Sequence, residues 1–243
     1  MTEEAGTREA LIQGYPWLKS GREPALDERT QRFVFKAFDR TLGKFLPHDV
    51  QAPILDVGCG EGALLAYFSA RGYSNLAGFD LSPANVELCH SRGLGFVQEL
   101  DALALGGFEQ GTQWSLITCF DLIEHLPKQR AVEFVATIRR RTAPGGTAVV
   151  QTPNMGSVLA SFHRYHDLTH EWGTTEDGAL DLFVAAGYAP EHVKVGPAWN
   201  ATSLRGRLRE LYVRGLHAAI YLSENRPRPR IPTKNLLISA TKE

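Results

Sequence analysis

Short apolar runs alternate with amphipathic stretches through the middle of the chain. Residues 53–57 (PILDV) and 114–120 (WSLITCF) have the composition of buried parallel strands. Apolar residues at helical spacing follow the first run over residues 63–71 and recur over residues 128–141. Strands that alternate with helices favour a parallel sheet with helices on both faces. The pattern therefore predicts an α/β fold.

The patterns at both ends of the chain predict further helices and a last strand outside this alternating core. Residues 1–50 have a helical pattern with an apolar stripe, which can pack on the sheet edge or form one wall of a substrate pocket. The stripe consists of Phe33, Phe35, Phe38, Leu42 and Phe45. A basic amphipathic helix is expected over residues 204–222, before a last strand over residues 235–240. We predict one domain over residues 1–243, with a helical cap (1–50), a ligand-binding core (51–196), a helical insertion or lid (197–233) and a last strand (234–243).

A glycine-rich turn, Gly58-Cys59-Gly60-Glu61-Gly62, joins the first strand to the first helix of the core, and Asp56 stands just before it. Glycines at alternate positions let the backbone approach a ligand, and the N–H groups of the following helix start favour a polar or anionic group. Asp80 ends the next strand about 20 residues on, where a carboxylate can accept hydrogen bonds from ribose hydroxyls. The turn predicts a nucleotide-like cofactor. Its spacing differs from the G-x-G-x-x-G of dinucleotide sites, which disfavours a dinucleotide oxidoreductase.

The Asp-x-Gly-x-Gly-x-Gly pattern over residues 56–62 resembles the first motif of class I S-adenosylmethionine (SAM)-dependent methyltransferases. The resemblance covers about residues 50 to 195 and includes Asp80, Asp101, the segment after the fourth strand and a Pro-Gly-Gly turn at residues 144–146. It implies SAM as the cofactor and a Rossmann-like, seven-stranded, mostly parallel sheet with an antiparallel last strand.

The family pattern also implies which residues bind SAM. The glycines would approach its methionine part, Asp80 would hold the ribose, and Asp101 would contact the adenine amino group. The alternative for Asp101 is a loop-capping aspartate. The implied cofactor-binding residues are Asp56, Gly58, Cys59, Gly60, Asp80, Leu81, Asp101, Ala102, Phe120 and Asp121.

The segment Asp121-Leu122-Ile123-Glu124-His125 after the fourth strand allows two interpretations. Glu124 and His125 can order the loop without a metal. The spacing is also similar to the Glu-x-x-Glu-His motif of ubiquinone-pathway and small-RNA 2′-O-methyltransferases, with Asp121 in place of the first Glu. In that case Asp121, Glu124 and His125, completed by His170, would bind a divalent ion that acidifies a hydroxyl. Mg, Mn and Zn suit such ligands about equally.

A histidine-rich stretch follows the fifth strand. Its Asp167-x-Thr169-His170-Glu171 segment resembles one found in bacterial small-molecule and glycan-modifying methyltransferases. A hydroxyl acceptor must lose its proton, and histidine is the usual base near neutral pH. We predict His170 as the catalytic base and His125 as the second candidate. His163 and His166 are expected on an exposed polar loop.

The expected reaction is O-methylation of a small-molecule acceptor: a sugar, a glycan or a natural-product intermediate. The methyl group would pass in line from SAM to a hydroxyl. N- or C-methylation and a catalytically silent SAM-binding subunit remain alternatives.

Composition limits the classes of partner and the compartment that we expect for this protein. The net charge of −1 provides no basic field, so no nucleic-acid partner is expected. The three cysteines lack C-x-x-C spacing, and the N-terminal sequence lacks an apolar leader, which together predict a cytoplasmic protein. We expect a monomer or a homodimer. The basic helix over residues 204–222 favours a lid or dimer contact, with a membrane-surface or lipid-linked substrate as the less favoured alternative.

Overall fold

The structure is a computed structural model that describes residues 28–223 and 229–243. Residues 1–27 of the predicted cap and residues 224–228 of the predicted insertion lie outside the described residues.

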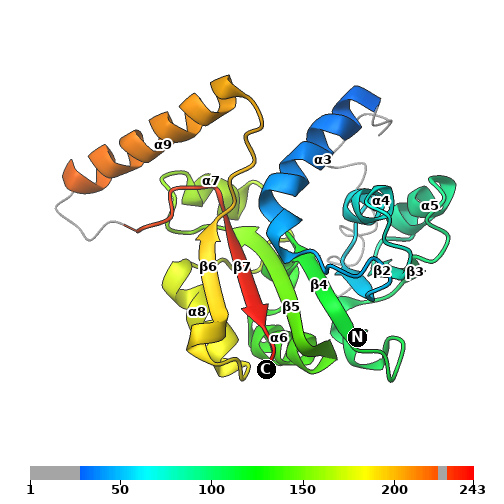
Figure 1. The fold of residues 1–243 in the computed structure, drawn as a ribbon. Coiled ribbons are helices and arrows are strands. Elements are labelled where there is room, and N and C mark those ends of the chain that lie inside the picture. Colours follow the sequence, from blue (N-terminus) through cyan, green and yellow to red (C-terminus); the bar gives the residue numbers. More distant parts are fainter. Residues whose placement is uncertain (1–27, 224–228) are drawn as a thin grey trace.

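A seven-stranded sheet forms the centre of the molecule (Figure 1). The strands are β1 (Ile54–Val57), β2 (Leu76–Asp80), β3 (Gln98–Glu99), β4 (Trp114–Phe120), β5 (Thr142–Pro153), β6 (Val193–Pro197) and β7 (Asn235–Thr241). Their order across the sheet is β3-β2-β1-β4-β5-β7-β6. The pairs from β3 to β5 are parallel, whereas β7 runs antiparallel to both β5 and β6. This confirms the predicted Rossmann-like sheet with an antiparallel last strand.

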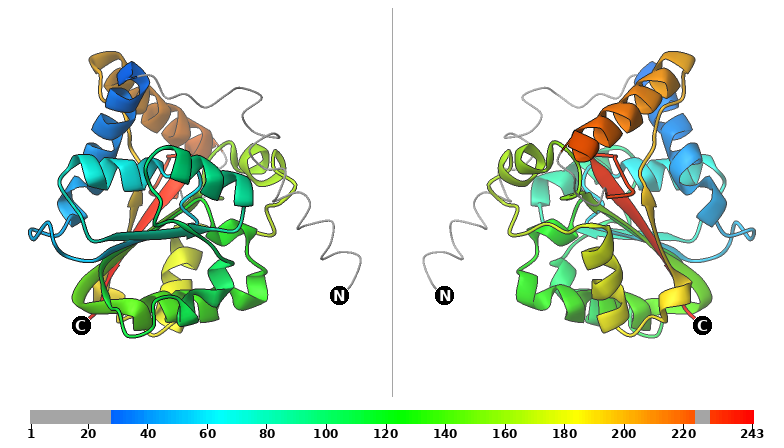
Figure 2. Two further views of the ribbon diagram at one scale, coloured as in Figure 1. Left: turned by 90° about the vertical axis from the view of Figure 1, so that its right-hand side faces the viewer. Right: turned by 90° about the vertical axis from the view of Figure 1, so that its left-hand side faces the viewer.

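Helices cover both faces of the sheet, as predicted. They are α3 (Glu28–Leu42), α4 (Ala63–Ala70), α5 (Pro83–Ser91), α6 (Ala131–Arg141), α7 (Ala160–Tyr165), α8 (Glu176–Ala185) and α9 (Leu204–Ser223). Short 3-10 turns lie between them: η1 (Gly43–Phe45), η2 (Ala102–Gly107), η3 (Ile123–His125), η4 (Lys128–Arg130) and η5 (Pro190–His192). Figure 2 shows α4 and α5 on one face and α6 and α8 on the other.

Each face buries its own hydrophobic core. Phe79, Trp114 and Phe183 are almost completely buried in the core beneath α6 and α8. Tyr67 and Phe68 are fully buried in the core beneath α3 and α4. Full burial of such large side chains contributes about 1.5–3 kcal/mol each, so both helical layers are tied to the sheet.

The apolar stripe of the predicted cap packs largely against the core on this face of the sheet. Leu42 is fully buried, and the rings of Phe35 and Phe38 pack edge-on against Tyr67, with centroids 5.6 and 5.5 Å away. Phe33 is 59% exposed and lines a cavity instead. Most of α3 therefore packs against the core, while its first turns leave that contact.

Some local details differ from the sequence expectations. The Pro-Gly-Gly turn at residues 144–146 lies within β5, at a register irregularity opposite Trp114 and Leu116. Helix α8 is capped by Thr175, whose Oγ1 accepts the N–H of Gly178 at 3.3 Å. These differences shift the ends of elements and leave the topology unchanged.

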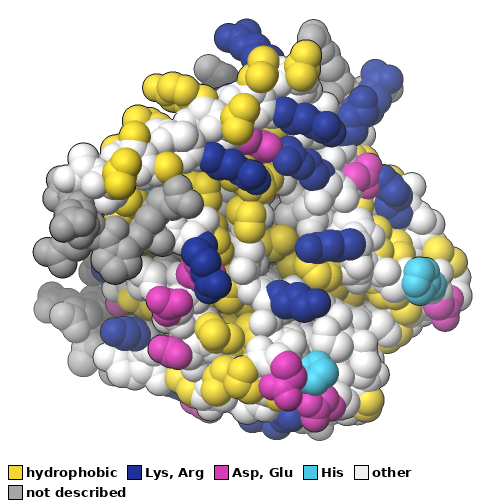
Figure 3. Space-filling model, turned by 60° about the vertical axis from the view of Figure 1, so that its left-hand side comes forward, with side chains coloured by type: hydrophobic (Ala, Val, Ile, Leu, Met, Phe, Trp, Pro, Cys, Tyr) yellow, Lys and Arg dark blue, Asp and Glu magenta, His cyan; other side chains and the backbone are white. Residues whose placement is uncertain are grey.

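Helix α9 projects from the carboxyl edge of the sheet, and its apolar side chains are largely exposed. Leu208, Leu211 and Tyr212 are more than half exposed, and hydrophobic side chains run along this helix in Figure 3. His217 is its only buried residue. Among the described residues, no helix combines the length and apolar content needed to cross a bilayer.

Candidate active site

The glycine turn after β1 has a backbone shape that requires glycine. Gly58, Gly60 and Gly62 have φ values of +67°, +53° and +78°, in the left-handed region that side chains rarely allow. The N–H groups of Gly58 and Cys59 both donate to the carbonyl of Phe79, at 2.9 and 3.0 Å. These bonds anchor the turn to the end of β2 and leave Gly60 facing open space.

Asp80 joins this turn to the start of α5. Its Oδ2 accepts the N–H of Gly60 at 2.8 Å, while Oδ1 accepts the N–H of Ser82 at 2.9 Å and Nδ2 of Asn85 at 3.0 Å. Ser82 in turn caps α5, with Pro83 in the first helical position. One carboxylate thus holds two loops in place at the carboxyl edge of the sheet.

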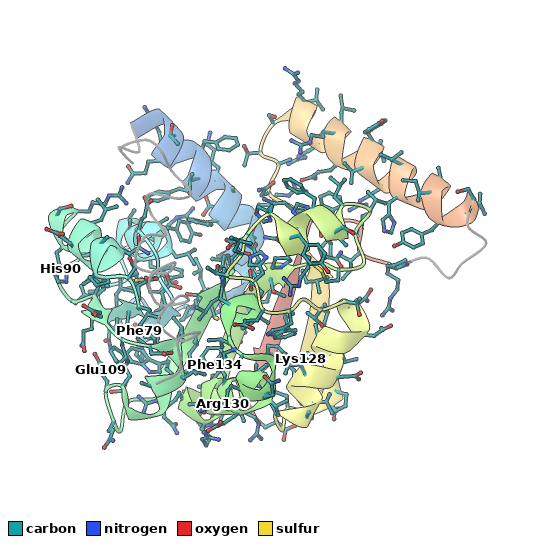
Figure 4. All side chains as sticks on the ribbon, turned by 180° about the vertical axis from the view of Figure 1, so that it is seen from behind. Phe79, His90, Glu109, Lys128, Arg130 and Phe134 are labelled. Carbon is teal, nitrogen blue, oxygen red and sulfur yellow. The ribbon has the colours of Figure 1, made fainter. Side chains whose placement is uncertain are left out.

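A cavity of about 240 Å³ opens above these loops, at the carboxyl ends of β1, β2 and β4. Ligands of open α/β sheets bind at this edge. Asp101 lines the cavity and also caps η2, because its Oδ1 accepts the N–H of Leu103 at 2.8 Å. Phe79, labelled in Figure 4, lines the cavity, and its ring packs against that of Phe108 with centroids 4.9 Å apart.

Asp56 lies beneath the glycine turn and not in the cavity. It is 2% exposed, and its Oδ1 accepts the hydroxyl of Thr118 at 2.6 Å. Burial raises the pKa of this carboxyl from about 3.8 to about 7, although the hydrogen bond from Thr118 acts to lower it. The nearby charge of Asp80 adds a smaller increase. Asp56 therefore joins the end of β1 to β4 and does not line the cavity.

Cys59 also points away from the cavity. Its side chain is 7% exposed and packs in a small core with Cys89. A hydrogen bond with Cys89, together with burial, raises the pKa of the Cys59 thiol well above its usual value. This cysteine contributes backbone and packing to the turn.

A cluster of polar side chains lies on the opposite side of the cavity. His125 lines the cavity, and its Nδ1 is 2.8 Å from Oγ1 of Thr169. That hydroxyl donates to Oδ1 of Asp167 at 2.6 Å. Because an ionised carboxylate only accepts, the Thr169 proton points to Asp167, and the Thr169 oxygen accepts the Nδ1 proton of His125. With the proton on Nδ1, the lone pair of the His125 ring is on Nε2.

His170 lies behind His125, with ring centroids 4.7 Å apart. Its Nδ1 donates to the backbone carbonyl of His163 at 2.9 Å, and its Nε2 lies 3.9 Å from Oδ2 of Asp167. It is 7% exposed and does not line the cavity. The two predicted catalytic histidines are therefore brought together, with His125 in front.

Glu124, His125 and His170 offer one ligand atom each, and these atoms lie within 4.8 Å of one another. Glu124 is almost fully buried, and its Oε2 accepts the hydroxyl of Thr152 at 3.0 Å. One carboxylate and two imidazoles, each held by an acceptor at Nδ1, suit a divalent cation.

Asp121 lies outside this group, in contrast to the expected metal ligand set. Its carboxylate accepts hydrogen bonds from Gln151 at 3.0 Å and Asn235 at 3.1 Å, so it is directed toward β5 and β7. Its φ of +50° is unusual for a residue with a side chain. This conformation turns the chain after β4 so that Leu122 and His125 face the cavity.

Comparison with known proteins places this geometry in a family. The model of a methyltransferase domain family matches residues 26–211, which is more than half of the chain. The chain belongs to the class I SAM-dependent methyltransferases. SAM is accordingly the cofactor, and the cavity beside the glycine turn is the candidate site for it.

Curated relatives align with only part of this methyltransferase. It is 34% identical over 105 residues to the ubiquinone biosynthesis O-methyltransferase of Methylococcus capsulatus, which covers 41% of this chain and 43% of the relative. It is 32% identical over 108 residues to that of Psychrobacter cryohalolentis, covering 42% and 40%. The matches span about two fifths of the length of these relatives.

Solved structures show the same fold at low sequence identity. A SAM-dependent methyltransferase from Archaeoglobus fulgidus superposes with a TM-score of 0.65 at 17% identity, covering 87% of this chain and 94% of that one. The magnesium protoporphyrin IX methyltransferase of Synechocystis gives 0.58 at 11% identity, covering 100% and 98%. These similarities establish the architecture of the methyltransferase.

Eight of the ten predicted cofactor residues line the cavity. They are Gly58, Gly60, Asp80, Leu81, Asp101, Ala102, Phe120 and Asp121. Asp56 and Cys59 lie below it, for the reasons given above. Their binding roles stay predictions.

Further lining residues were not predicted from the sequence. They include Ser82, Asn85, Leu100, Leu122, Leu126 and Thr169. Ser82 and Asn85 follow Asp80 closely, so the helix start they form was the available signal. Nothing in the sequence joined Thr169 to His125.

Proposed function

We propose that this methyltransferase transfers the methyl group of SAM to a hydroxyl oxygen of a small molecule. The observation that carries the proposal is the hydrogen-bond chain from Asp167 through Thr169 to His125, which lines the cavity. Oxygen acceptors need a base because the hydroxyl proton must leave. The curated relatives are named as O-methyltransferases, which favours the same acceptor atom.

In this mechanism SAM supplies an electrophilic methyl group on a sulfonium. The acceptor oxygen attacks the methyl carbon in line, the carbon–sulfur bond breaks, and S-adenosylhomocysteine leaves. The hydroxyl proton passes to Nε2 of His125. The resulting imidazolium is stabilised through Thr169 by the carboxylate of Asp167, much as a buried carboxylate stabilises the histidine of a hydrolase triad. His125, the second candidate from sequence, takes the role of base here because it faces the cavity and His170 does not.

A divalent cation is the alternative route to the same deprotonation. Glu124, His125 and His170 would hold it, and it would acidify the acceptor hydroxyl. His125 would then be a ligand through Nε2 and could not accept the proton. The donor set suits Mn or Zn better than Mg, because two of the three ligands are imidazoles.

Methyl transfer from labelled SAM to a panel of sugars, phenols and natural-product alcohols tests the proposal. We expect His125→Asn to lower turnover at least about 100-fold while SAM binding by calorimetry persists. His170→Asn should also lower turnover, because it supports His125 or the cation. His48→Asn is the matched control, since His48 is exposed and outside both groups. Unchanged turnover in His125→Asn would show that His125 is not the base.

Metal analysis of the purified protein separates the two routes. Bound Mn or Zn that is lost in Glu124→Gln, with activity lost on chelation, would support the cation. Full activity in the presence of a chelator would exclude it and leave His125 as the base.

A further inference from the structure

A second cavity of about 520 Å³ lies beside the histidine cluster, between α3, α9 and the loop over residues 198–203. His163 connects the two regions, because it lines this cavity and its carbonyl accepts the Nδ1 proton of His170. Ala198 lies on the same side of the sheet core as the first cavity. It lines the second cavity and packs against the same core as Phe120, which lines the cavity beside the glycine turn.

Two buried hydrogen-bonding groups line this second cavity without a protein partner. Ser157 is 93% buried, and its Oγ makes no hydrogen bond within the described part of the chain. The same holds for the buried Nε1 of Trp199, judged against the same residues. A buried donor left without an acceptor costs about 1–3 kcal/mol, so natural proteins seldom leave one unless a ligand or water completes it. Both groups can donate to a ligand oxygen.

The charges around the cavity favour an anion. Lys234 and Arg209 line it. The one lining carboxylate, Glu210, is already neutralised, because both of its oxygens accept from the guanidinium of Arg40 at 2.8 and 2.7 Å. In Figure 3 Lys and Arg side chains gather below α9.

Helix α9 adds a further positive contribution. Its capping residue Ser203 and its first-turn residue Gly206 both line the cavity, and Oγ of Ser203 accepts the N–H of Gly206 at 3.1 Å. The amino end of a 20-residue helix carries a partial positive charge. Apolar side chains, among them Phe33 and Leu216, form much of the remaining wall.

We propose that this second cavity binds the methyl acceptor through an oxyanion, a carboxylate or a phosphate, carried on an apolar body. Lys234, Arg209, Ser157 and Trp199 recognise the oxyanion, while Phe33 and Leu216 contact the apolar part. The proposal rests on the proposed function, since it names the class of acceptor presented to the histidine cluster. Among the expected acceptors, it selects acidic natural-product intermediates over neutral sugars.

A pair of fluorescent probes tests the anion site on the full chain. One is 8-anilinonaphthalene-1-sulfonate, an apolar anion, and the other is N-phenyl-1-naphthylamine, which has the same rings without the sulfonate. Saturating SAM keeps both probes out of the cavity beside the glycine turn. We expect Arg209→Gln and Lys234→Gln each to weaken binding of the anionic probe about tenfold, with binding of the neutral probe unchanged.

The matched control is Arg207→Gln, which removes the same charge from the same helix outside the cavity lining. It should leave both probes unaffected. Equal weakening in Arg207→Gln and Arg209→Gln would overturn the proposal, because it would indicate a diffuse charge effect. Equal loss of both probes in Arg209→Gln would also overturn it. Ser157→Ala gives an independent test, in which only the anionic probe should bind more weakly.

Displacement of the anionic probe identifies the acidic group. We expect benzoate or phenyl phosphate to displace it at lower concentration than phenol does. The stronger of the two anions identifies the acid, and displacement by phenol at equal concentration would contradict the proposal. SAM titration in the same variants should give unchanged affinity. Failure of the wild-type protein to bind SAM would overturn the proposed function, while the comparison of Arg209→Gln with Arg207→Gln would still decide on the anion site, because neither residue lines the cavity beside the glycine turn.

Discussion

Oγ1 of Thr169 lies 2.8 Å from Nδ1 of His125, although the two residues are 44 positions apart in the chain. The bond joins the turn after β4 to the histidine-rich segment after β5. Because Thr169 also donates to Asp167, one side of the His125 ring is held and the other faces the cavity. The orientation and tautomer of the candidate base are thereby set before any acceptor binds.

Removal of this hydroxyl should release the His125 ring. In the wild-type protein we expect the Nδ1-protonated tautomer, visible in the ¹⁵N chemical shifts of the labelled imidazole. Thr169→Val should shift the population toward the Nε2-protonated form, which lacks a lone pair at the cavity. The loss of one hydrogen bond, about 1 kcal/mol, is enough to change the tautomer ratio severalfold.

Thr169→Ser is the control for this change, because it keeps the hydroxyl and removes only the methyl group. Its imidazole shifts should match those of the wild-type protein. If Thr169→Val gave the same shifts as well, the hydrogen-bond chain would have no part in setting the tautomer.

Two glycines of the turn should respond differently to alanine. A Cβ at Gly60 would meet no atom within 4 Å, whereas one at Gly62 would lie 2.5 Å from Leu94 and 3.0 Å from Sγ of Cys89. Gly60→Ala should therefore cost only backbone strain, about 1 kcal/mol, but it places a methyl group where SAM is expected. Gly62→Ala should lower the free energy of unfolding by more, since the clash adds to the strain.

Urea unfolding and SAM calorimetry on both variants check this separation. Gly62→Ala should lose more stability than Gly60→Ala. Relative to the stability that each variant loses, Gly60→Ala should lose more SAM affinity. The reverse order would place the cofactor away from Gly60.

Asp56 should make stability depend on pH. Its pKa is raised by burial from about 3.8 to about 7, so the folded protein holds a proton there that the unfolded chain has released. The contribution of Asp56 is therefore full below about pH 4 and is lost as the pH rises to about 7. The slope is about 1.4 kcal/mol per pH unit, or on the order of 4 kcal/mol over the whole window.

Asp56→Asn removes this titration and keeps the shape of the side chain. The free energy of unfolding of the wild-type protein, relative to that of Asp56→Asn, should fall as the pH rises from about 4 to about 7. Parallel pH profiles would show that Asp56 is ionised in the folded protein across this window.

The sheet was predictable because its signals are local and repeated. The apolar runs at β1, β4 and β7 match the observed strands closely, and Ser82 with Pro83 marks the start of α5. The short strand β3 was not predictable from the pattern, because its two residues are both exposed. Strand pairing over long distances followed from the family resemblance and not from the pattern alone.

The candidate site was predictable only where its residues lie next to a motif. The glycines and Asp80 are set by the turn that they form. Asp121 was expected at a metal, but Gln151 and Asn235 hold its carboxylate elsewhere, and neither contact has a signal in the sequence. No sequence signal indicated that His125 lines the cavity while His170 lies behind it, since this arrangement depends on how two distant loops pack.

Titration of SAM into the wild-type protein tests the central claim most directly. The account predicts saturable binding of one SAM molecule per chain, because the glycine turn, Asp80 and Asp101 surround a single cavity at the sheet edge. A folded protein that gives no saturable heat with SAM would contradict the account.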